Sequence, residues 1–148
     1  MMIPNMIAAF LGTVGFSILF NVPKKYYIGC GITGMIGWTC YILVYTSLLS
    51  TSATFFSTVL VVLLARILAV KMKCPITIFL VPGIFPLLPG ASVYYTAHYL
   101  VTGELREAAL NGMNALKLAF AIVLAIVVIF SVPKQVFQMR YWKNKEKV

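Results

Sequence analysis

The sequence contains five apolar stretches, each close to the length that a helix needs to cross a lipid bilayer. They cover about residues 4–20, 28–48, 53–70, 75–100 and 112–132. A bilayer core about 30 Å thick requires roughly 20 apolar residues per helix. Hydrophobic residues make up 61% of the 148 residues and charged residues only 10%, a composition far from that of a soluble domain. We therefore predict an all-α integral membrane protein with five transmembrane helices.

Basic residues fall at alternate ends of these predicted helices. Nine of the twelve lysines and arginines lie between the first and second stretches, between the third and fourth, or after the fifth. The positive-inside rule then predicts an outward N-terminus, a cytoplasmic C-terminus and an odd number of crossings. The net charge of +9 is explained by this orientation, so we expect contact with the lipid bilayer and no nucleic-acid partner.

The chain divides into a membrane domain and a short tail. Residues 1–132 are predicted to form one five-helix membrane domain, and residues 133–148 a basic, aromatic cytoplasmic tail suited to anionic lipid headgroups. The first stretch has no basic residues before it and no small-residue cleavage site after it, which favours a retained helix over a signal peptide.

Small residues recur every four positions in the first two predicted helices. Ala8 and Gly12 form such a stripe in the first, and Gly29, Thr33 and Gly37 in the second. This spacing is typical of helices that pack closely in lipid. Whether the two stripes pack against each other is left open.

Two other residue types have simple interpretations. Arg66 lies close enough to the inner end of the third predicted helix for its side chain to extend past Lys71 to the membrane surface. Cys30, Cys40 and Cys74 lack the paired spacing of a metal or redox site. We expect the cysteines to be small buried hydrophobic residues, and we expect no metal and no cofactor.

The fourth apolar stretch is interrupted by prolines and glycines. Pro82, Gly83, Pro86, Pro89 and Gly90 fall within nine residues, FLVPGIFPLLPG running up to the last of them. Proline lacks a backbone donor and costs about 3 kcal/mol in a helix interior. We predict that the helix is broken from Pro82 to Gly90, which leaves the carbonyls of residues 78, 82 and 85 without their usual helical donors.

A break within the membrane would create a binding site. A second half-helix beginning near Ala91 presents the free amides of its first turn, with Ser92 as an additional donor, and the positive end of its dipole attracts a carboxylate. Secondary transporters use discontinuous helices in this way. The alternative is a proline-kinked helix without a ligand.

Polar side chains follow the break and are the remaining site candidates. Tyr94 and His98 lie four residues apart, Tyr95 is adjacent, and a ligand or a proton relay would use such groups. In the fifth helix, Asn111, Asn114 and Lys117 recur every three residues. Lys117 either extends to the outer surface or faces a cavity as a counter-charge for a carboxylate.

The segment PGIFPLLPG, followed by ASVYY and TGE, resembles the signature of the threonine/serine exporter family, in its smaller, five-helix C-terminal half. The resemblance covers most of the chain and implies export of threonine and serine across a bacterial cell membrane, driven by an ion gradient of H+ or Na+. Some split members of the family export dicarboxylates such as succinate. The resemblance also implies a separately encoded, larger membrane subunit as partner, while a homo-oligomer is left open.

Three classes of function follow from the sequence. The first is a secondary transporter subunit that exports small carboxylate-bearing solutes, and the second is a noncatalytic membrane assembly subunit. The third, a membrane enzyme, is disfavoured because the three carboxylates, Glu104, Glu107 and Glu146, lie in polar segments and only one histidine is present. We therefore predict no catalytic residues.

Overall fold

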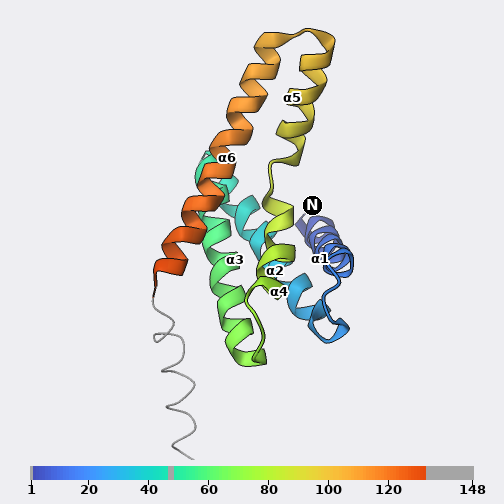
Figure 1. Ribbon diagram of the computed structural model, residues 1–148, viewed down its shortest axis with the longest axis vertical. Helices are drawn as coiled ribbons and strands as arrows, with labels where there is room; N and C mark the ends of the chain where they lie inside the picture. The colour runs from blue at the N-terminus through green and yellow to red at the C-terminus, as the bar shows by residue number, and fades with distance from the viewer. Residues whose placement is uncertain (1, 47–48, 133–148) are drawn as a thin grey trace, which may run out of the picture.

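The computed structural model describes residues 2–46 and 49–132, and the tail predicted for residues 133–148 lies outside them. Every regular element in these two ranges is helical (Figure 1). The elements are α1 (Met2–Leu19), η1 (Lys24–Tyr26), α2 (Tyr27–Tyr45), α3 (Ser50–Met72), α4 (Thr77–Ile84), η2 (Phe85–Leu87), α5 (Gly90–Thr102) and α6 (Leu105–Ser131). The all-α prediction is therefore confirmed.

Helix length and composition support fewer membrane crossings than the sequence predicted. Within the described residues, three segments are long and apolar enough to span a bilayer: Lys24–Tyr45, Ser50–Met72 and Leu105–Ser131. The pair Thr77–Leu87 and Gly90–Thr102 makes a fourth if the two halves count as one span, and α1 is apolar but shorter. The structure thus supports a membrane protein with three to four spans by length, and the prediction of five is not confirmed.

Helices α1 to α4 form a bundle in which α2 is central. The glycines of α2 let neighbouring helices approach closely on two sides. The small-residue stripes predicted in the first two helices do not pair with each other. A Cβ at Gly12 would meet nothing within 4 Å, whereas one at Gly34 would collide with Thr13 of α1. The predicted stripe of α2 faces α3 and α4 instead, since a Cβ at Gly29 would lie 2.7 Å from the Phe79 ring.

Arg66 links the end of α6 to α3 and does not extend to the surface. Its side chain is only 7% exposed, and its guanidinium donates to the carbonyl oxygens of Ile129 at 2.6 Å and Val132 at 2.9 Å. The expectation of a surface-seeking arginine was wrong because the last carbonyls of a helix need donors. Phe130 adds a cation–π contact, with its ring centroid 5.4 Å from the guanidinium carbon.

Helices α3 and α6 run in the same direction. The first part of α6 extends beyond the N-terminal end of α3. Arg66 meets the C-terminal end of α6, while Thr51 at the start of α3 lies beside the same groove as Lys117 in the middle of α6. The first twelve residues of α6, roughly 18 Å of helix, therefore extend past the beginning of α3. Together with α5 they form a hairpin that projects from the bundle (Figure 1).

Candidate functional site

The fourth apolar segment is broken at Leu88 and Pro89, between η2 and α5. Leu88 adopts an extended conformation (φ −64°, ψ 140°), and α5 begins at Gly90 with Pro89 before it. The two halves, Thr77–Leu87 and Gly90–Thr102, are bent by 53°. The predicted break is present, but it is narrower than expected because α4 continues through Pro82.

The carbonyl groups that the prolines deprive of helical donors are each satisfied in another way. The Phe85 amide donates to the Pro82 carbonyl, and the Leu88 amide donates to the Phe85 carbonyl at 3.2 Å. These are the tighter bonds of a 3₁₀ turn. The Ile78 carbonyl, which Pro82 would otherwise leave without a donor, accepts a hydrogen bond from the Cys30 thiol, with the sulfur 3.2 Å from the oxygen.

The sequence alone suggested that Cys30 is only a small buried hydrophobic residue. In the structure it also donates a hydrogen bond to α4. It is fully buried, whereas Cys40 and Cys74 are only partly buried. A lone cysteine in an apolar span gives no sequence signal for this bond, because its acceptor lies 48 residues away.

Replacing Cys30 is expected to test this bond through stability. Cys30→Ala leaves a buried carbonyl without a donor and is expected to lower the free energy of unfolding in detergent by about 1–3 kcal/mol. Cys30→Ser keeps a donor and is expected to retain most of that stability. Cys40→Ala serves as the matched control. Equal unfolding midpoints for Cys30→Ala and Cys40→Ala would show that the thiol does not support α4.

The first half of the broken segment is anchored in the bundle. Phe85 packs against Phe16 and Phe20 of α1, with ring centroids 4.1 and 5.2 Å apart. Leu87 is buried, and a Cβ at Gly83 would lie 3.0 Å from the Thr33 methyl group. The glycine at position 83 therefore has a packing role in α4.

The second half of the segment, α5, has no buried residue and packs mainly against α6. Of the predicted substrate-binding residues, Gly90 and Ala91 are exposed and Ser92 is half-buried. A Cβ at Gly90 would meet no atom within 4 Å. At Pro89 the chain thus passes from a half-helix that is packed in the bundle to an open one, which has no buried residue.

The predicted polar residues on α5 form one aromatic row. Tyr94 stacks on His98 with centroids 6.2 Å apart and an interplanar angle of 7°, a contact that the sequence analysis did not predict. Tyr95 touches Tyr94 edge-on at 5.5 Å and stacks on Tyr99, which the sequence analysis did not single out. The row is exposed, since Tyr94 is 64% and Tyr95 47% accessible.

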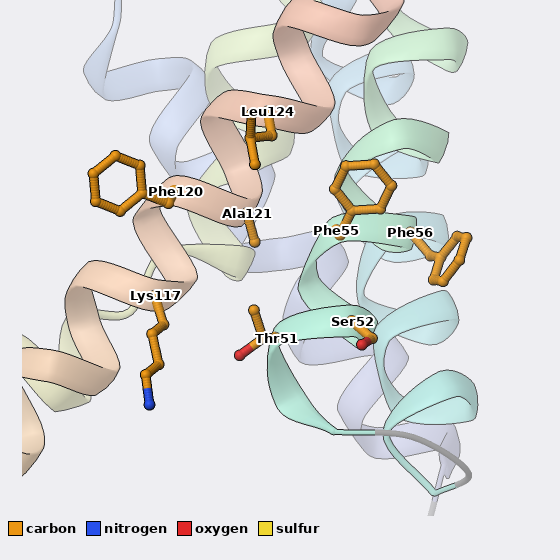
Figure 2. Close-up of a pocket in the computed structure, with 8 residues that line it drawn as sticks. All are labelled: Thr51, Ser52, Phe55, Phe56, Lys117, Phe120, Ala121 and Leu124. Carbon is orange, nitrogen blue, oxygen red and sulfur yellow. The ribbon is translucent and has the colours of Figure 1, made fainter.

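The predicted polar residues of α6 lie on a more open surface. The Asn111 side chain donates to the Glu107 carbonyl at 2.9 Å, and Asn114 is exposed. Lys117 lines a groove of about 420 Å³ between α3 and α6 (Figure 2), and no residue of the proline break lines it. The other lining residues, which the sequence analysis did not select, are Thr51, Ser52, Phe55, Phe56, Phe120, Ala121 and Leu124.

Comparison with known families decides which kind of protein carries this broken segment. A family model described as "Threonine/Serine exporter, ThrE" matches residues 5–132. The chain belongs to the threonine/serine exporter family. The match includes the bundle, the break and the projecting hairpin, so the sequence resemblance is confirmed, and with the apolar helices it indicates a membrane protein of a transport family rather than an enzyme family.

A curated relative adds little about function. A Haemophilus influenzae protein described as uncharacterized is 32% identical over 91 residues. The matched stretch is 61% of this chain but only 31% of the relative, so the chain spans about a third of that protein's length. No solved structure matches the chain.

Proposed function

We propose that this member of the threonine/serine exporter family is a membrane subunit of a secondary transporter that exports small carboxylate-bearing solutes, threonine and serine first among them. The observation that carries the proposal is the change at Pro89 from an anchored half-helix to an open one. Backbone groups left open within an apolar segment need protein or water as partners, and transporters use broken helices as substrate sites.

The substrate carboxylate binds at the start of α5 in this proposal. In a helix that begins at Gly90, the amides of Ala91 and Ser92 have no acceptor within the helix, and the helix dipole adds a partial positive charge there. The Gly90 amide already donates to the Leu88 carbonyl at 2.8 Å. These two amides and the Ser92 hydroxyl are a suitable donor set for one carboxylate.

Alternating access then follows from the unequal packing of the two halves. Phe85 and Leu87 keep α4 and η2 in the bundle, while α5 moves with the start of α6 about Leu88 and Pro89. The protein crosses the membrane five times with its N-terminus outside, and the coupling ion is H+ or Na+. The cell membrane of a bacterium is the proposed location.

A larger membrane subunit of the same family covers α5. Its exposed row of Tyr94, Tyr95 and His98 is more polar than a surface that faces only lipid. The relative in Haemophilus influenzae, of which the chain covers 31%, shows that related sequence occurs within a much longer protein. A second copy of this chain is the alternative occupant of the same surface.

Efflux measurements test the proposal and separate it from its alternatives. Cells that express this chain, a larger member of the family from the same genome, both or neither are loaded with labelled threonine or succinate. We expect threonine efflux only when both proteins are present, and an affinity-tagged chain should retain the larger one on purification. Succinate efflux alone would favour a dicarboxylate exporter, and efflux that is unaffected by Pro89→Ala at matched expression would favour an assembly subunit.

A further inference from the structure

The groove between α3 and α6 is polar at one end and apolar at the other. Lys117 and the hydroxyl-bearing Thr51 and Ser52 lie at one end, beside the first turn of α3 (Figure 2). Phe55, Phe120 and Leu124 continue from there along the two parallel helices. The side chain of Ala121, only 6% exposed, lies between the helices at the base of the groove.

The polar end of the groove lies level with the beginning of α3. Helix α3 has 23 residues, is apolar enough to span a bilayer and begins at Ser50, so its first turn is near one face of the membrane. Phe55 lies about one turn deeper along α3, and Phe120 and Leu124 lie about one and two turns deeper along α6. The groove therefore has its charge at the surface and its apolar lining toward the hydrocarbon.

Lys117 has no carboxylate near it on its own helix. In the part of the chain that the structure describes, the carboxylates are Glu104 and Glu107, which precede Lys117 by ten residues or more. Ten residues of α-helix separate side chains by roughly 15 Å along the axis. A lysine at the edge of a membrane span is stabilised by an anionic group at the surface.

We propose that this groove binds a bilayer phospholipid, with its phosphate on Lys117 and the hydroxyls of Thr51 and Ser52. One acyl chain lies along Phe55, Phe120 and Leu124. A transported hydroxy amino acid fits less well, because it has no apolar chain to fill the deeper end and would bring its ammonium group toward a lysine. The proposal concerns a site separate from the proline break and stands independently of the proposed transport function.

Native mass spectrometry of the purified full chain in detergent, titrated with phosphatidylglycerol, tests the site. Loss of a charge-assisted hydrogen bond to phosphate is expected to weaken binding of the most tightly held lipid roughly tenfold or more in Lys117→Gln. Lys117→Arg keeps the charge and should bind like the unaltered protein. Arg106→Gln, which removes an exposed basic residue of the same helix outside the groove, is the matched control and should have no effect.

A second pair of measurements distinguishes a lipid from a free anion. Leu124→Trp fills the apolar end and should also weaken phosphatidylglycerol binding, while added glycerol 3-phosphate should not displace the lipid. Lys117 and Leu124 are both exposed, so neither change removes a core contact, and circular dichroism verifies the helix content. Unchanged lipid binding in Lys117→Gln or Leu124→Trp, or displacement by glycerol 3-phosphate, would overturn the proposal.

Discussion

Pro89→Ala is expected to reduce threonine efflux by about tenfold or more, with the amount of protein in the membrane unchanged. Alanine restores an amide at position 89. It also removes the steric clash with the proline ring that keeps Leu88 out of the helical conformation. The segment from Phe85 to Thr102 then becomes free to form one continuous helix and to lose its 53° bend. A straight helix provides neither the free first-turn amides nor the joint between the two halves.

Pro82→Ala is the matched control for this change. Pro82 is buried within α4, where the helix continues through it, so alanine there alters no break. Efflux through Pro82→Ala should stay close to that of the unaltered protein at equal expression. Similar losses in both variants would indicate general damage to packing and would argue against a specific role of the break.

Arg66→Ala is expected to produce the largest loss of stability. The change removes two charge-assisted hydrogen bonds, to the carbonyls of Ile129 and Val132, and a hydrogen bond to a charged group contributes about 1.5–3 kcal/mol. We expect the free energy of unfolding in detergent micelles to fall by about 3 kcal/mol or more, measured by circular dichroism during denaturant titration.

The control for Arg66 is Arg106→Ala, because Arg106 is exposed on the projecting hairpin. Such a surface change should alter the unfolding free energy by less than about 0.5 kcal/mol. Arg66→Lys should lie between the two, since a lysine offers donors but not the planar fork of arginine. The account of α6 anchoring would fail if Arg66→Ala and Arg106→Ala unfolded at the same denaturant concentration.

Features that depend on local backbone chemistry could be predicted from the sequence. The break at Pro89 follows from a missing amide and a steric clash, which act within a few residues. The placement of Tyr94 and His98 as neighbours on one face of α5 follows from helical spacing alone. The site residues themselves, from Pro82 to Lys117, stay predictions until binding is measured.

Features that depend on contacts between distant segments could not be predicted. The bond from Cys30 to the Ile78 carbonyl and the bonds from Arg66 to the end of α6 join residues 48 and 63 or more positions apart. The pairing of the small-residue stripes was not predictable either, because glycine spacing marks a close-packing face without naming its partner. For the same reason the groove at Lys117 has no signature in the sequence of α6 alone.

The distance between α3 and α5 is the most direct test of the proposed movement about Leu88 and Pro89. Spin labels are attached through Ile67→Cys and Val101→Cys, both at exposed positions, in a background with serine in place of the three native cysteines. The chain is reconstituted with the proposed larger subunit in liposomes, and pulsed electron paramagnetic resonance records the distance distribution. We predict that threonine shifts this distribution and that Pro89→Ala abolishes the shift. An identical distribution with and without threonine, in liposomes that export it, would contradict the account.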